Sequence, residues 1–247
     1  MKRKNLVDLI QTVLKEKADL GIAYDGDADR IGIVDNTGEV IWGDQYMALM
    51  WPEILEKHPH APAIIEVKCS QALVDEVTRL GGQPVFYKTG HSLIKAKMKE
   101  LNAPFTGEMS GHMFFADEYF GYDDAFYASG RLLRMLVQKD CPLSHMVQKL
   151  PHYYATAENR VACPDEVKFA VVERLQEHFK TKGKVIDVDG VRVLFGDGWG
   201  LIRASNTQPV LVTRCEAKTP ERLQEIAAII REALISQPEV ETFEWEY

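Results

Sequence analysis

Apolar residues at the start of the chain recur with the spacing of an amphipathic helix. They occupy positions 6, 7, 9, 10, 13 and 14, which predicts a helix over residues 6–17, and a strand-like apolar run follows at residues 20–24. A helix that leads into a strand is half of an α/β unit, but no earlier strand is present for this helix to pack against. We therefore expect residues 1–39 to be the end of a domain whose N-terminal portion is missing from this chain.

Strands and helices then alternate over residues 40–151. The pattern predicts strands at residues 40–42, 63–67 and 84–87 and helices at residues 44–56, 71–80, 92–101, 125–137 and 144–150. Such alternation predicts a mainly parallel sheet between helical layers, which is a three-layer α/β domain. A glycine-rich polar stretch, residues 106–124, interrupts the pattern. Loops of that length inside a compact domain are usually functional or disordered.

The pattern changes again at Pro151, after which strands follow one another directly. Strands are expected near residues 153–162, 184–187, 191–195, 200–203 and 210–217, with helices at residues 164–179 and 220–235. Consecutive strands with few helices predict a separate, smaller α+β domain at the C-terminus. The chain is thus predicted to be α/β and to hold three parts, residues 1–39, 40–151 and 152–247.

Composition excludes several classes of protein. The 29 Lys and Arg against 37 Asp and Glu give a net charge of -8, which argues against a nucleic-acid partner. No apolar run approaches the roughly 20 residues of a membrane helix, and the N-terminus lacks the apolar core of a signal peptide. We therefore expect a cytoplasmic protein without a membrane partner. The four cysteines are widely separated, which indicates free thiols rather than a zinc site or a disulfide scaffold.

The strongest chemical signal is an acidic loop, residues 25–30, with the sequence Asp-Gly-Asp-Ala-Asp-Arg. Asp25, Asp27 and Asp29 alternate directly after an apolar strand, so that their carboxylates can converge on one hard cation such as Mg²⁺. A calcium-binding EF-hand loop would need Gly and Glu where Arg30 and Asn36 stand, which excludes it. Two alternatives stay open for this loop. It could belong to a phosphatase that uses Asp25 as its nucleophile, or it could be a solvated turn without a ligand.

Two further segments carry groups that suit a phosphorylated sugar. Glu108, Ser110 and His112 alternate between two glycines, and in an extended backbone they would share one face, where they could bind sugar hydroxyls and move a proton. Each of these side chains alone is also typical of an exposed loop. A second segment offers a guanidinium, hydroxyls and backbone N–H groups to a phosphate dianion. Its candidate phosphate-binding residues are Arg203, Ser205, Asn206, Thr207 and Arg214.

Together, the three segments resemble the α-D-phosphohexomutase family. The resemblance implies that Asp25, Asp27 and Asp29 hold Mg²⁺, that Arg30 contacts phosphate, and that the last segment binds the phosphate that is not transferred. It also places Lys68 and His91 around the substrate, with Glu108, Ser110 and His112 in a sugar-binding loop. His112 is a candidate acid/base. Ala28 and Met109 are typical of the phosphomannomutase and phosphoglucomutase branches rather than of phosphoglucosamine mutases.

The resemblance implies a reaction for which this chain lacks one catalytic residue. Family members interconvert hexose 1-phosphates and 6-phosphates, here mannose or glucose phosphates, through a hexose 1,6-bisphosphate and a phosphoserine in a Thr-x-Ser-His-x-Pro motif. The chain contains no such motif, and its only Ser-His pair, Ser144-His145, reads as the start of a helix. Residues 1–39, 40–151 and 152–247 would be the end of the second domain, the third domain and the fourth.

We therefore expect that the chain binds a phosphorylated hexose but does not turn over by itself, with an N-terminal half that carries the serine as a candidate partner. The alternatives are a non-catalytic sugar-phosphate binding module, one half of a split mutase, and the aspartate-nucleophile phosphatase.

Overall fold

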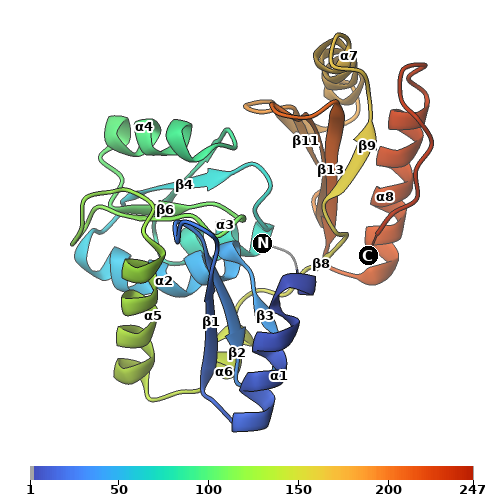
Figure 1. Cartoon of the computed structure of the whole chain (residues 1–247). Helices are drawn as coiled ribbons and strands as arrows, with labels where there is room; N and C mark the ends of the chain where they lie inside the picture. Colours follow the sequence, from blue (N-terminus) through green and yellow to red (C-terminus); the bar gives the residue numbers. More distant parts are fainter. Residues whose placement is uncertain (1–2, 247) are drawn as a thin grey trace. The chain divides into compact units, whose positions relative to one another are not determined.

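The structure is a computed structural model that describes residues 3–246. The chain folds into two compact units, which divide between Pro151 and His152 (Figure 1). Among the described residues, no helix is long and apolar enough to cross a membrane. The four cysteines are free thiols, and Cys69, Cys163 and Cys215 are buried.

The first unit begins with a small antiparallel sheet. A 3₁₀ turn, η1 (Arg3–Leu6), leads into α1 (Val7–Glu16), which is followed by β1 (Leu20–Tyr24), β2 (Ile31–Asp35) and β3 (Val40–Ile41) in the order β1-β2-β3. Helix α1 packs so closely on this sheet that a Cβ added at Gly21 would lie 2.6 Å from the Val13 side chain. The acidic loop is therefore the connection of a β-hairpin, between β1 and β2.

A three-layer α/β domain makes up the rest of this unit. Its elements are α2 (Gly43–Lys57), β4 (Pro62–Glu66), α3 (Gln71–Arg79), β5 (Gln83–Tyr87), α4 (His91–Leu101), β6 (Phe105–Gly107), β7 (Met113–Phe115), α5 (Ala125–Lys139) and α6 (Leu143–Val147). The sheet order is β5-β4-β6-β7, with β4 parallel to β5 and β6 and with β7 antiparallel. The predicted mainly parallel fold is confirmed.

Side chains alternate between the two faces of this sheet. Ile64 and Phe114 pack with Ile94 and Met98 of α4 on one face. On the other face, apolar side chains such as Phe105 belong to the larger core with α2, α3 and α5 (Figure 1). Because β4, β5 and β6 are parallel, their carboxyl ends meet at one edge of the sheet, where ligands of α/β proteins usually bind.

Two sequence-based expectations for this domain are wrong. The strand predicted at residues 40–42 does not join the parallel sheet, because it forms β3 of the small antiparallel sheet. Residues 106–124 were expected to be one long polar loop, whereas β6 and β7 form a tight hairpin around residues 108–112, which we call the hairpin turn. The two strands have only three residues each, too few for a period-2 pattern to be recognised in the sequence. Their apolar residues are fully buried, which identifies them as core strands once the fold is known.

The second unit is an α+β domain, as predicted. It contains β8 (Tyr154–Ala155), β9 (Asn159–Ala162), α7 (Lys168–Lys180), β10 (Lys184–Ile186), β11 (Val191–Leu194), β12 (Gly198–Ala204), β13 (Val210–Ala217) and α8 (Pro220–Ile235). The antiparallel sheet has the order β10-β11-β12-β13-β8, and β9 also pairs with β13. Helices α7 and α8 share a core with one face of this sheet. Register places Arg192, Leu201 and Arg214 together on the opposite face.

Candidate active site

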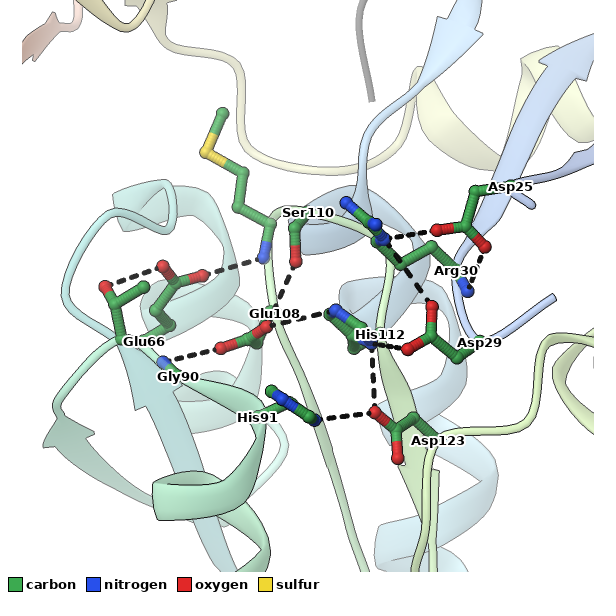
Figure 2. A network of polar contacts seen from close by, with 12 residues as sticks. Asp25, Asp29, Arg30, Glu66, Gly90, His91, Glu108, Ser110, His112 and Asp123 are labelled. Atoms are coloured by element: carbon green, nitrogen blue, oxygen red, sulfur yellow. Dashed lines mark hydrogen bonds and ion pairs between the residues drawn. The ribbon is translucent and has the colours of Figure 1, made fainter. Parts of the chain in front are cut away.

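The acidic loop holds its three carboxylates close together. Oxygen atoms of Asp25, Asp27 and Asp29 all lie within 4.8 Å of one another. The loop is closed by a hydrogen bond from the Ala28 amide to the Asp25 carbonyl (3.2 Å), with Ala28 at a φ of 59°. The Arg30 amide donates to Asp25 Oδ1 (3.2 Å), and Arg30 Nε lies 2.5 Å from Asp25 Oδ2 and 3.5 Å from Asp29 Oδ1 (Figure 2). A short loop thus presents three anionic groups beside one guanidinium.

The electrostatics of this loop fit a divalent cation. Burial raises the pKa of Asp29, and the charges of Asp25 and Asp27 raise it further. Burial also acts to raise the pKa of Asp25, but hydrogen bonds and charge from Arg30 lower it below its ordinary value. Asp25 Oδ2 and Asp29 Oδ1 are both buried atoms that lie beside Arg30 Nε. Three clustered carboxylates form the all-oxygen donor set that Mg²⁺ prefers, so the residues present fit this ion.

The hairpin turn brings Glu108, Ser110 and His112 together by a different geometry from the one expected. The expectation of an extended backbone is wrong, because the Gly111 amide donates to the Glu108 carbonyl (3.0 Å) and Gly111 has a φ of +105°. The three side chains are nevertheless neighbours. Ser110 Oγ donates to Glu108 Oε2 (3.1 Å), and His112 Nε2 lies 3.8 Å from the same oxygen (Figure 2).

A backbone link joins the hairpin turn to the acidic loop. The Ile31 amide donates to the Gly111 carbonyl (3.1 Å), and Arg30 and His112 form an isolated antiparallel bridge. This approach leaves no room for a side chain at Gly111, where a Cβ would lie 2.5 Å from the Ile31 carbonyl oxygen. Two segments about 80 residues apart in the sequence therefore form one site.

Glu108 is a buried carboxylate in this site. It is only 4% exposed, and its Oε1 accepts a hydrogen bond from the Gly90 amide (2.8 Å) at the start of α4. Burial raises its pKa, and the nearby charge of Glu66 raises it further, against hydrogen bonds from Gly90 and Ser110 that lower it. Glu108 is thus held in place by the backbone while its remaining lone pairs face the hairpin turn.

Glu66 is a residue of the site that the sequence did not reveal. It ends β4, is 0% exposed, and accepts hydrogen bonds from Thr89 Oγ1 (2.9 Å) and the Met109 amide (2.9 Å). Lys68 Nζ lies 3.1 Å from its Oε1, so the predicted substrate residue Lys68 is oriented by Glu66. This one carboxylate ties together the segments that follow β4, β5 and β6. A glutamate at the end of an apolar strand was the available signal, but its partners are 23 and 43 residues away.

Asp123 is the second residue that sequence reasoning missed. Its Oδ1 lies 2.7 Å from Lys95 Nζ, and its Oδ2 lies 3.2 Å from His91 Nδ1 and 3.0 Å from His112 Nδ1 (Figure 2). Burial acts to raise the pKa of Asp123, but the hydrogen bond and charge of Lys95 lower it below its ordinary value. The rings of His91 and His112 stack with their centroids 5.2 Å apart. His91 therefore lies beside His112.

The predicted phosphate-binding residues lie in the second unit. Arg203 Nε donates to Asp189 Oδ2 (2.9 Å), and Ser205 Oγ accepts from the amides of Thr207 (3.3 Å) and Gln208 (3.2 Å), which shapes a tight polar turn. Asn206 and Thr207 are exposed at its tip.

Arg214 lies on the next strand, on the same face of the sheet as Arg203. Its guanidinium lies 5.7 Å from the ring centroid of Trp199 and 3.7 Å from Glu216 Oε1. Two arginines and an exposed polar turn are therefore presented together by β12 and β13.

Comparison with known proteins identifies the family to which these two units belong. Family models match residues 1–38 (phosphoglucomutase/phosphomannomutase, alpha/beta/alpha domain II), 42–154 (alpha/beta/alpha domain III) and 158–233 (C-terminal domain). The chain belongs to the phosphoglucomutase/phosphomannomutase family, that is, to the α-D-phosphohexomutases. The family resemblance seen in the sequence is confirmed.

Individual relatives agree with this assignment. The phosphomannomutase/phosphoglucomutase of Pseudomonas aeruginosa is 45% identical over 234 residues, which are 94% of this chain and 50% of that protein. A phosphoglucomutase of Neisseria meningitidis is 40% identical over 240 residues, 96% of this chain and 52% of that protein. A crystal structure of a family protein from Burkholderia thailandensis matches with a TM-score of 0.90 and 39% identity, over 97% of this chain and 52% of that one. The chain thus spans about half the length of the relatives that it matches.

Proposed function

We propose that this chain supplies the metal, sugar and phosphate sites of a phosphomannomutase/phosphoglucomutase, which interconverts hexose 1-phosphates and hexose 6-phosphates. The observation that carries the proposal is the link between the acidic loop and the hairpin turn. His112 Nδ1 lies 3.6 Å from Asp29 Oδ2, and the Ile31 amide is bonded to the Gly111 carbonyl. A cation site and a set of sugar-binding groups therefore face the same space, as transfer of a phosphoryl group to a sugar requires.

Asp25, Asp27 and Asp29 would hold Mg²⁺, which neutralises negative charge on a phosphoryl group during its transfer. Arg30 is assigned to the phosphate, and the position of its Nε close to both Asp25 and Asp29 supports this role. The fit of the carboxylates to Mg²⁺ and the identity of the relatives support this assignment.

Glu108 and Ser110 would bind sugar hydroxyls, while Lys68 and His91 lie around them. The raised pKa of Glu108 reflects its burial, and in such a site hydrogen bonds to a ligand are stronger than in water. His112, between Glu108 and Asp123, is the candidate group that accepts or donates a proton at a sugar hydroxyl. The distal phosphate is assigned to Arg203, Ser205, Asn206, Thr207 and Arg214.

The reaction also needs a phosphoserine and a hexose 1,6-bisphosphate that forms and reorients. No segment of this sequence has the Thr-x-Ser-His-x-Pro motif, so we propose that the chain does not turn over without an N-terminal half that carries this serine. We assign residues 1–39, 40–151 and 152–247 to the end of the second, the third and the fourth family domains, of which residues 1, 2 and 247 lie outside the described part. Met109 and Ala28 favour mannose or glucose phosphates as substrates. We place the protein in the cytoplasm and expect no nucleic-acid partner.

Complementation tests this proposal. The chain is mixed with the half of the Pseudomonas aeruginosa relative that it does not match, and conversion of mannose 1-phosphate to mannose 6-phosphate is measured with Mg²⁺. We expect activity from the mixture and from neither part alone, with a loss on Glu108→Gln and none on Glu56→Gln, which changes an exposed glutamate of α2.

Two outcomes would favour the alternatives. Retained binding of glucose 1-phosphate without activity in the mixture supports a non-catalytic module. Release of phosphate by the chain alone, lost on Asp25→Asn, supports the aspartate-nucleophile phosphatase and contradicts the mutase assignment.

A further inference from the structure

A second group of metal-binding atoms lies next to the acidic loop. It consists of Asp29, His112 and Asp123, whose donor atoms all lie within 4.8 Å of one another. His112 Nδ1 lies 3.0 Å from Asp123 Oδ2 and 3.6 Å from Asp29 Oδ2. The three residues come from the acidic loop, the end of the hairpin turn and the segment before α5. Figure 2 shows the imidazole next to both carboxylates.

The imidazole nitrogen of this group lacks a hydrogen-bond partner. His112 is 8% exposed, and among residues 3–246 no atom meets the geometry of a hydrogen bond with its Nδ1. Both carboxylate oxygens are near this nitrogen, yet neither is aligned with it. A buried polar nitrogen that is left without a hydrogen bond costs free energy, and a ligand that accepts its lone pair would remove this cost.

The distances suit a metal ion bound by all three residues. Two ligands at about 2.1 Å from a tetrahedral ion lie about 3.4 Å apart, and the two measured separations fall on either side of this value. A bound ion would therefore need only small side-chain adjustments. The remaining coordination positions would be open to water or to an oxygen of a bound phosphate.

Neighbouring side chains already orient the proposed metal ligands. Lys95 Nζ contacts Asp123 Oδ1 at 2.7 Å, which leaves Oδ2 on the side of His112. The other ring nitrogen of His112, Nε2, lies 3.8 Å from Glu108 Oε2. A carboxylate behind the free nitrogen of a metal-binding histidine is a recurrent arrangement that fixes the ring and raises its basicity.

We propose that Asp29, His112 and Asp123 form a second divalent-cation site, which prefers Zn²⁺, Co²⁺ or Ni²⁺ to Mg²⁺. An imidazole ligand favours these metals, whereas the all-oxygen set of Asp25, Asp27 and Asp29 suits Mg²⁺. Because Asp29 belongs to both sets, a metal at the second site competes with the first set for this carboxylate. It also occupies His112 Nδ1. The site does not depend on the mutase assignment, since it rests only on the geometry of this chain.

Metal titration of the whole chain tests the site. Binding of Co²⁺ is followed by visible absorption and binding of Zn²⁺ by calorimetry, for the unchanged chain and for His112→Gln and Asp123→Asn. We expect both variants to lose affinity by more than the roughly 10- to 100-fold that is typical of changes outside the metal ligands. Asp27→Asn changes only the first set, and His145→Gln removes an exposed histidine of α6. Both controls should keep the Co²⁺ spectrum.

A second measurement does not depend on how the variants fold. In the unchanged chain with isotope-labelled histidines, substoichiometric Zn²⁺ should shift the NMR signals of His112 before those of the other six histidines. Unchanged affinity in His112→Gln, loss of binding in Asp27→Asn alone, or an initial shift at another histidine would each overturn the proposal. A near-ultraviolet Co²⁺–thiolate band would do the same, because it would place the metal on a cysteine.

Discussion

Replacement of Glu66 by Gln should loosen the hairpin turn without changing its shape. The carboxylate accepts hydrogen bonds from Thr89 and the Met109 amide and contacts Lys68. An amide of the same size has one acceptor oxygen, so its NH₂ group must face either the Met109 N–H or the Lys68 ammonium, and each of these is a donor. At least one buried interaction is lost in either orientation.

The size of this effect follows from the charge of the partners. A hydrogen bond that involves a charged group contributes about 1.5–3 kcal/mol, and a donor left unsatisfied adds a cost of similar size. Loss of the Glu66 charge also removes a repulsion that raises the pKa of Glu108, which offsets part of the cost. We therefore expect Glu66→Gln to lower the free energy of unfolding by about 2–3 kcal/mol.

Urea unfolding and hydrogen exchange together measure this effect. Exchange of the Met109 amide reports the hairpin turn directly, and at tenfold per 1.4 kcal/mol we expect it to accelerate by roughly 30- to 100-fold. Glu56→Gln is the matched control, because Glu56 is exposed on α2. An unchanged exchange rate of Met109 together with an unchanged free energy of unfolding in Glu66→Gln would refute the positioning role of this carboxylate.

Three further predictions concern stability. Gly111→Ala should destabilise the fold by about 1–3 kcal/mol, measured by thermal unfolding, because Gly111 has a φ of +105° and its new Cβ would meet the Ile31 carbonyl. The pKa of Glu108 is raised in the folded state, so the unfolded chain releases this proton at a lower pH than the folded chain. The contribution of Glu108 to stability therefore falls as pH rises from about 4.5 towards the folded pKa. Urea midpoints measured across this pH range should fall, and Glu108→Gln should abolish this pH dependence. Arg131→Met should cost about 3–5 kcal/mol in urea unfolding, because it leaves the buried carboxylate of Asp117 without the guanidinium that lies 2.8 Å away; an unchanged midpoint would contradict this reasoning.

The acidic loop could be found in the sequence because its information is local. Three carboxylates within five residues, directly after an apolar strand, must lie close together in any fold, and this closeness indicates a cation site. Likewise, the alternation of strands and helices over residues 63–101 was enough to predict a parallel sheet, since each segment carries its own period. The interruption at residues 106–124 was recognised as a candidate site, but its hairpin was not. The strands β6 and β7 are defined by burial and pairing, which a three-residue pattern cannot reveal.

Glu66 and Asp123 could not have been found in this way, because the partners that define their roles lie on distant segments of the chain. Asp123 stands beside Asp124, yet Asp124 caps α5 by accepting from the Tyr127 amide (2.9 Å), whereas Asp123 bonds to His91 and Lys95 and lies close to His112. A one-residue difference in position separates a structural carboxylate from one in the site. That difference depends on the path of the chain between Phe114 and α5, where Phe114 and Asp123 form a β-bridge.

The same dependence on distant pairing explains why the hairpin turn and the acidic loop act as one site. The acidic loop leaves β1 and returns into β2 at Ile31, and the Ile31 amide bonds to Gly111 rather than to a strand of its own sheet. This bond fixes the distance between Asp29 and His112, so a change in the hairpin turn must also move the imidazole relative to the carboxylates. Glu66 holds the opposite side of the turn through the Met109 amide. The turn is thus held on both sides by the Ile31 amide and Glu66, in addition to the hydrogen bonds that Glu108 makes with Gly111 and His112 inside the turn.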